Sequence, residues 1–194
     1  MQTRVPLKFG TEVLSSVTCA RVKVLVENNL GNEGEGWGET PLSVQWVWPS
    51  EIAYAERHDT LIEFCKLIAK RWDGFDRVGH CLEIGHEMIM NDLPVALKEF
   101  NDSDYKHSEA MPWLAALVCA SAFDLAVHDA YGMINQVPTY QAYGREFLSS
   151  DLSCFLEPAE DANIQFESKY PADFLILNPP APLLAFAVIT NSPS

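Results

Sequence analysis

The stretch Pro112–Met133, with the sequence PWLAALVCASAFDLAVHDAYGM, is the most strongly helical part of this chain. Pro112 suits the first turn of a helix, and Gly132 followed by Pro138 marks its end. The larger apolar residues recur at helical spacing along one stripe, while alanine and cysteine keep most of the remaining surface small. Because this helix is apolar or small nearly all round, we expect it to lie between two layers of a packed core.

Two apolar stretches raise the question of a membrane, and neither is predicted to span one. In the quoted stretch, Asp124, His128 and Asp129 end the apolar run short of the roughly 20 residues that a bilayer requires. The second stretch, Phe174–Thr190, contains Asn178 and three prolines, which would leave backbone groups unpaired in lipid. The first ten residues contain no apolar run typical of a signal peptide, so a cytoplasmic location is predicted.

The charge of the chain excludes a large class of partners. Among 194 residues, 13 Lys and Arg stand against 27 Asp and Glu, which gives a net charge of -14. Such a chain repels phosphate backbones and anionic lipid head groups, so neither nucleic acid nor a membrane surface is expected as a partner. The five cysteines are scattered without a CxxC pair, and we expect them to be reduced thiols.

A β-hairpin is predicted near the start of the chain. In Val17–Val26, apolar valines and alanine alternate with Arg21 and Lys23, the period of two that places one strand face on a core. The segment Asn28–Gly36 then supplies the glycines and asparagines of a tight turn, and Trp37–Glu39 resumes an extended run.

Helical periodicity follows the hairpin. A surface helix is predicted over Ser50–Trp72, with shorter helices over His80–Met90 and near Pro94–Phe100. Strands first and helices afterwards predict an α+β fold, in which a short antiparallel sheet is followed by a helical bundle. Beyond Tyr170 the sequence becomes apolar and proline-rich without an evident partner, so we expect a poorly structured C-terminal tail.

Three stretches together resemble the N-terminal capping domain of the enolase superfamily, of the mandelate racemase and muconate-lactonizing enzyme type. The first is Val5–Gly10, followed by the strand Arg21–Val26 and by the G-E-G-W-G-E run Gly34–Glu39. The second is Ala120–Gly132, with its A-x-D-x-A-x-x-D core before a glycine, and the third is Val137–Gly144. The resemblance covers roughly residues 5–150, and the order of the stretches makes it more specific than any one motif.

The resemblance implies two domains with different roles. Residues 1–150 would form the capping domain, and residues 151–194 an incomplete start of the barrel or a disordered tail. In this family the barrel removes a proton next to a carboxylate, while a divalent metal, usually Mg²⁺, stabilises the enediolate. The barrel residues that do this have no matching positions here, so no catalytic or metal-binding residue and no cofactor is assigned to this chain.

The function implied is the substrate-specificity part of a racemase, dehydratase or cycloisomerase, inactive as this fragment. The partners implied are the barrel domain of the parent enzyme, whose cofactor would be magnesium, and a small carboxylate substrate; assembly into a homo-oligomer stays open. A non-catalytic α+β module that binds a protein partner is the alternative, and a small metal-carboxylate protein is a third hypothesis.

In the family, two loops of the capping domain close the site and select the substrate. The candidate loops here are Phe9–Ser16 and Thr40–Pro49, which make Phe9, Trp46 and Trp48 the predicted substrate-binding residues. Trp46 and Trp48 flank Val47, and their two indoles can form an apolar wall with hydrogen-bonding N–H groups. The alternative is that both pack under the following helix.

Other polar residues have structural interpretations beside functional ones. Glu39 could meet a barrel lysine or end a strand. Glu83 and His86 have the spacing of a di-iron ligand pair, but no second copy of that motif exists in the chain. Asp124 and His128 are four residues apart on the predicted helix, which permits a charge-assisted pair, and structural satisfaction of the histidine is the favoured interpretation.

Overall fold

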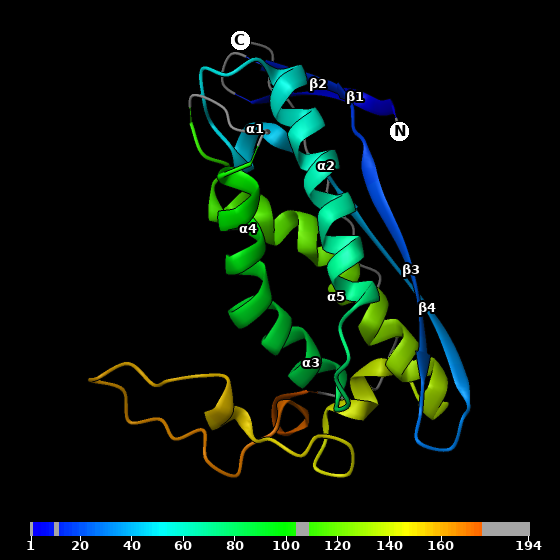
Figure 1. Ribbon diagram of the computed structural model, residues 1–194. Helices are drawn as coiled ribbons and strands as arrows, with labels where there is room; N and C mark the ends of the chain where they lie inside the picture. Colours follow the sequence, from blue (N-terminus) through cyan, green and yellow to red (C-terminus); the bar gives the residue numbers. More distant parts are fainter. Residues whose placement is uncertain (1, 10–11, 104–108, 176–194) are drawn as a thin grey trace.

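The computed structural model describes residues 2–9, 12–103 and 109–175, with side chains from residue 16 onward (Figure 1). Two antiparallel hairpins precede the helices, so the fold is α+β as predicted. The predicted tail is described only as far as residue 175. In that part it contains short 3-10 helices at Leu152–Cys154 and Pro171–Phe174, with irregular chain between them. Residues 176–194 lie outside the described residues.

Two hairpins open the chain. Strand β1 (Gln2–Phe9) pairs with β2 (Glu12–Ser16), and β3 (Cys19–Glu27) pairs with β4 (Glu33–Pro41) in an unbroken register. The second hairpin confirms the prediction from alternation and turn residues. Its turn contains Gly31 at a φ of 77°, a conformation that glycine adopts without strain.

The two loops predicted to close a site are not simple loops. Most of Phe9–Ser16 is strand β2, so the expectation of a loop there is wrong. The other segment, Thr40–Pro49, begins with the end of β4 and contains the short helix α1 (Val44–Val47). Strands and helices this short carry too few residues for periodicity to show in the sequence.

The remaining helices follow the predicted order with shifted ends. They are α2 (Tyr54–Asp73), α3 (Cys81–Glu87), α4 (Leu93–Asn101) and α5 (Trp113–Asn135). The two short helices predicted separately are joined by a π-helical turn at Met88–Asp92, so α3 and α4 are nearly continuous. A π-helical turn contains more residues than an α-helical turn, so it accommodates the change in helical pattern that the sequence shows at this place.

Strand β4 lies directly against α5, and two glycines of the strand make this contact possible. A Cβ atom added at Gly36 would lie 2.2 Å from both the Ala126 carbonyl oxygen and the Ala130 nitrogen. A Cβ atom added at Gly38 would lie 2.0 Å from the Ala122 carbonyl oxygen. Real carbon atoms never approach so closely. The strand and helix backbones are therefore in van der Waals contact, which no residue other than glycine permits at these strand positions.

The main hydrophobic core lies between α5 and the other helices. Leu61, Phe64 and Ile68 on α2 are buried against Ala115 and Cys119 of α5. Figure 1 shows α2 and α4 beside the N-terminal half of α5, with the β3–β4 hairpin along its C-terminal half. Helix α5 is therefore covered by helices on one part and by the sheet on another, as its nearly uniform apolar surface predicts.

Helix α5 is also the one helix of the described chain that is long and apolar enough to cross a membrane. Half of its most apolar window is buried inside the fold. The core helix of a globular domain passes the same test of length and composition, and the burial of α5 agrees with the predicted packed helix.

Replacing Gly36 by Ala tests the contact between β4 and α5. The added methyl group has no space beside Ala126 and Ala130, so the strand must move away from the helix. We expect Gly36→Ala to lower the free energy of unfolding by at least about 2 kcal/mol, measured by urea denaturation.

The matched control is Gly74→Ala at the end of α2. A Cβ atom there would lie 3.9 Å from its nearest neighbours, and the φ of -96° suits alanine. We expect a change below about 1 kcal/mol. Equal effects of the two substitutions would show that the tight contact at Gly36 does not support the fold.

Candidate functional site

The predicted substrate-binding residues have different surroundings. Trp48 is only 2% exposed and belongs to the main core, so its ring faces other core side chains and no ligand can reach it. Trp46 is 48% exposed on α1 and is free to contact another molecule. Phe9 lies at the end of β1, and its side chain lies outside the described residues. The packing interpretation thus fits Trp48, while the binding role of Trp46 and Phe9 stays a prediction.

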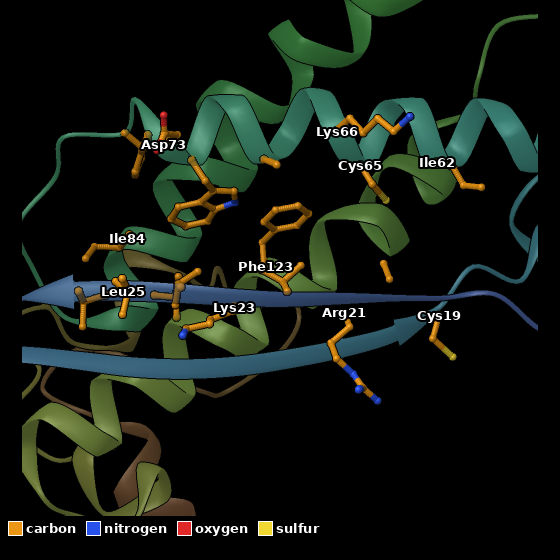
Figure 2. A pocket seen from close by; sticks show the side chains of 18 of the residues that line it. Cys19, Arg21, Lys23, Leu25, Ile62, Cys65, Lys66, Asp73, Ile84 and Phe123 are labelled. Atoms are coloured by element: carbon orange, nitrogen blue, oxygen red, sulfur yellow. The ribbon is translucent and has the colours of Figure 1, made fainter. Parts of the chain in front are cut away.

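A groove lies between β3 and α2 (Figure 2). Its volume is about 840 Å³. One wall is β3 from Cys19 to Val26, and the opposite wall is α2 with residues Ile62, Cys65 and Trp72. Phe123 of α5 lies between these walls, and Ile84 of α3 lines the groove on the side of Leu25 (Figure 2).

Cations on β3 are held by carboxylates of the neighbouring strand. Arg21 pairs with Glu39 at 2.7 Å, and Lys23 pairs with Glu35 at 2.6 Å. These hydrogen bonds lower the pKa of both carboxyl groups. Lys23 also lies 5.7 Å from the centre of the Trp37 ring. The contact of Glu39 with Arg21 across the hairpin fits the structural interpretation of this residue.

A second group of polar residues joins α5 to the segment that follows it. A hydrogen bond of 2.6 Å connects His128 Nδ1 with the Tyr143 hydroxyl, and His128 Nε2 lies 3.7 Å from Asp124 Oδ1. Burial raises the pKa of Asp124 and lowers that of His128, so the charged forms of both are disfavoured. Asp124 and His128 are therefore neighbours, as predicted, without the strong charge-assisted bond that the spacing permits.

His80 is a buried histidine that begins α3. Its Nδ1 accepts the N–H of Leu82, and its Nε2 is 2.9 Å from the carbonyl oxygen of Ala142. This pattern requires a proton on Nε2 and none on Nδ1, which is the neutral ring. Burial lowers the pKa of His80 and favours the same neutral form. His80 thus fixes both the start of α3 and the segment around Ala142.

Glu83 fixes the same region through four hydrogen bonds. Its carboxylate accepts the N–H of His80, the hydroxyls of Ser149 and Ser150, and the N–H of Ser150. Burial alone would raise the pKa of Glu83, but these hydrogen bonds lower it to about 2. The bonds occupy this carboxylate fully, which leaves the spacing to His86 without a role in metal binding.

The described residues gather no group of three or more His, Cys, Asp or Glu side chains that could hold a metal ion. A magnesium site of the enolase type needs several carboxylates, and the residues described here do not fit it. In the groove, Cys19 lies beside Glu39, but burial and this carboxylate raise the pKa of the Cys19 thiol, which disfavours the reactive thiolate. What the described residues offer is a binding surface and a rigid frame.

Comparisons with known proteins find no relative of this chain. No protein-family model matches the chain, and neither the curated proteins nor the solved structures contain a match to it. The resemblance to capping domains therefore rests on the sequence of this chain alone.

Sequence reasoning missed the groove, His80 and the role of Glu83. The spacing of His80 and Glu83 is that of a capping box, in which the first residue caps the helix and the third helical residue bonds back. That signal is present in the sequence, although histidine is an uncommon cap. The groove has no sequence signal, because it depends on how far α2 lies from β3.

Replacing Glu83 by Gln tests its bonds to Ser149 and Ser150. We expect a loss of about 1 kcal/mol in the free energy of unfolding at pH 7, since the site is partly exposed. The folded pKa of Glu83 lies below its ordinary value, so its contribution is complete above about pH 4.5 and is lost as the pH falls toward 2. The difference between wild type and variant should shrink over that range.

Glu87→Gln on the same helix is the control. Glu87 pairs with Arg77 at 2.8 Å at the surface, and such pairs contribute less than about 0.5 kcal/mol. If Glu83→Gln has no larger effect than Glu87→Gln, or if its effect grows at low pH, the bonds of Glu83 do not stabilise the fold.

Proposed function

We propose that this chain is the N-terminal capping part of a metal-dependent enzyme of the enolase superfamily. In this proposal the parent enzyme is a racemase, dehydratase or cycloisomerase that removes a proton next to a carboxylate. The chain by itself is inactive in this proposal, because the catalytic base and the magnesium ligands belong to a barrel that the described residues do not form. The proposed location is the cytoplasm, and the proposed ligand of the complete enzyme is a small carboxylate.

One observation carries the proposal: two of the stretches that resemble the family pack on each other. Gly36 and Gly38 of the G-E-G-W-G-E run contact Ala122, Ala126 and Ala130 of the A-x-D-x-A helix backbone to backbone. The Trp37 N–H also donates to Asp129 at 2.9 Å. Residues that carry the resemblance are therefore the residues that make this contact, which is expected if both motifs describe one structural unit.

The third stretch, Val137–Gly144, is attached to the same helix. The Thr139 hydroxyl lies 3.3 Å from the His128 carbonyl oxygen, and Tyr143 bonds to the His128 ring at 2.6 Å. A Cβ atom at Gly132 would lie 2.6 Å from the Thr139 hydroxyl. The chain that would lead toward a barrel thus leaves α5 in a fixed direction, which supports a role for α5 in joining two domains.

The substrate-facing role in this proposal falls to α1 and to Phe9 at the end of β1. Trp46 is the exposed aromatic residue of the first of these segments. An indole at the edge of a closed site can exclude water and contact an apolar substrate side chain. Trp48 anchors the segment by packing in the core, and its carbonyl accepts a hydrogen bond from buried Arg57.

The catalytic part of the proposal is tested with the gene product that continues past Ser194. We expect the continuation to encode a barrel, and the complete protein to exchange the α-proton of a carboxylic acid in D₂O when Mg²⁺ is present. Exchange is measured by NMR across a panel of small 2-hydroxy and N-acyl acids, with the 194-residue chain as the inactive control. A continuation without a barrel, or turnover by the 194-residue chain alone, would refute the proposal.

Trp46→Ala in that complete enzyme tests the substrate-facing role. Loss of the indole should lower kcat/KM by about tenfold for substrates with apolar side chains, and change the order of preference among substrates. Trp113→Ala, which removes an exposed tryptophan from α5, is the matched control and should leave the preference unchanged. An unchanged preference in Trp46→Ala would remove Trp46 from the site.

A second function, a non-catalytic interaction module, is favoured by a different observation. The groove beside β3 is apolar and open, and Leu25 on the same strand is 68% exposed. Surfaces of this kind are typical of protein contacts. A module would fold cooperatively and stay homogeneous as the 194-residue chain, whereas an isolated cap would bind ANS and aggregate.

A further inference from the structure

Two cysteine side chains meet where helix α2 packs on α5. A hydrogen bond between their thiols joins Cys65 of α2 to Cys119 of α5. The Cys119 sulfur also lies 3.6 Å from the carbonyl oxygen of Leu61, which is one turn before Cys65 on the same face of α2. Leu61 and Cys119 are fully buried in the main core, so the core holds Cys119 against this turn of α2.

The two thiols differ in their access to solvent. Cys119 has no exposed surface, whereas Cys65 is half-buried and lines the groove between β3 and α2. Figure 2 shows the Cys65 side chain extending from α2 into this groove. A small molecule in the groove can therefore reach the Cys65 sulfur, while the core shields the Cys119 sulfur.

The hydrogen bond makes the two thiols chemically unequal. It lowers the pKa of Cys65, because the Cys119 S–H group can donate to the thiolate that Cys65 forms. The same hydrogen bond and burial raise the pKa of Cys119. Cys65 is therefore the thiol that ionises first, and Cys119 keeps its proton beside it. The thiolate is the form of cysteine that reacts with oxidants.

The other three cysteines have different surroundings. Burial raises the pKa of Cys81 to about 12, and burial together with Glu39 raises the pKa of Cys19. Cys154 is exposed on the 3-10 helix near residue 152. Accessibility alone would make Cys154 the first thiol to react, so it is the natural comparison for Cys65.

We propose that Cys65 and Cys119 form an oxidation site for small hydroperoxides, at which Cys65 reacts with the peroxide and Cys119 then forms a disulfide with Cys65. The disulfide links α2 to α5 across the main core. The site consists of described residues only and does not depend on the proposed enzymatic function.

The reaction balances with one hydroperoxide as the oxidant. The Cys65 thiolate attacks the terminal peroxide oxygen, the O–O bond breaks, and the alcohol leaves with the proton that Cys65 had released. The Cys65 sulfur then carries a hydroxyl group as a sulfenic acid. The Cys119 sulfur attacks it, the S–O bond breaks, and the hydroxyl group leaves as water with the Cys119 proton. Two thiols are oxidised to one disulfide, and the hydroperoxide is reduced to an alcohol and water.

The packing lets the two sulfurs approach each other. A disulfide places its sulfurs about 2.05 Å apart, which is closer than two hydrogen-bonded thiols. One side of Cys65 faces the groove rather than the core, so this side chain can rotate about its Cα–Cβ bond. Cys119 is held by the core. The approach therefore needs movement of the Cys65 side chain and no separation of the helices.

Disulfide mapping of the folded 194-residue chain tests the site. The reduced chain is treated with about one equivalent of hydrogen peroxide, remaining thiols are blocked with N-ethylmaleimide, and an unreduced digest is analysed by mass spectrometry. We expect the Cys65 and Cys119 peptides to be joined in more than about half of the chains, with a mass loss of about 2 Da, and Cys154 to be blocked by maleimide. Consumption of Cys154 first, or no link between Cys65 and Cys119, would overturn the proposal.

Two variants assign the roles of the thiols. In Cys119→Ala the disulfide cannot form, so dimedone should trap Cys65 as a sulfenic acid. In Cys65→Ala the shielded Cys119 should stay unmodified. Cooperative unfolding in urea shows that each variant is folded. Trapping at Cys119 in Cys65→Ala, or none at Cys65 in folded Cys119→Ala, contradicts the assignment, and the mapping of the wild-type chain decides the pairing without either variant.

Oxidation in denaturing urea is the control for chance pairing. In the unfolded chain the shorter loop favours a link between Cys65 and Cys81, which are 16 positions apart, over the link to Cys119. The share of the Cys65–Cys119 link should therefore fall severalfold in urea. An equal share in folded and unfolded chains would mean that the fold does not create the site. Cys154→Ser, which removes the exposed thiol, should leave the link in the folded chain unchanged.

Discussion

The contact between β4 and α5 is the constraint on which the rest of the structure depends. Gly36 and Gly38 bring the strand backbone against the backbone of Ala122, Ala126 and Ala130, so the sheet and the central helix cannot separate without losing the contact along its whole length. Because α5 is held on this side, its other faces are available to α2 and α4. The core of the helical part is therefore built on a helix whose position the hairpin sets.

Polar residues beside α5 fix the position of the segment that follows this helix. His80 is buried, and the Glu83 carboxylate accepts several hydrogen bonds. Each of these residues links α3 to residues beyond 140. Histidine, glutamate and tyrosine in such a cluster resemble an active site in composition. Their bonds to backbone and serine groups, and the neutral forms that burial favours, point instead to a structural joint at which the chain leaves the helical part.

Two surfaces of the described chain are open to contact with another molecule. A capping role uses the end of the sheet where β4 leads into α1 and Trp46, while the groove between β3 and α2 is a second, apolar surface. One chain can accommodate both, since the two surfaces share no residue. The structure thus separates a rigid centre, formed by α5 and the hairpin, from surfaces that contact something else.

The sequence by itself determined the class of the fold, the hairpin β3–β4 and the central helix, because alternation and small-residue helical patterns are local signals. It also contained the residues of the glycine contact and the neighbours Asp124 and His128. Only the tertiary structure decided that Trp48 is core while Trp46 is exposed, that Glu83 serves two serines far along the chain, and that a groove lies beside β3. Burial and the distance between α2 and β3 depend on contacts between residues far apart in sequence, which no local pattern records.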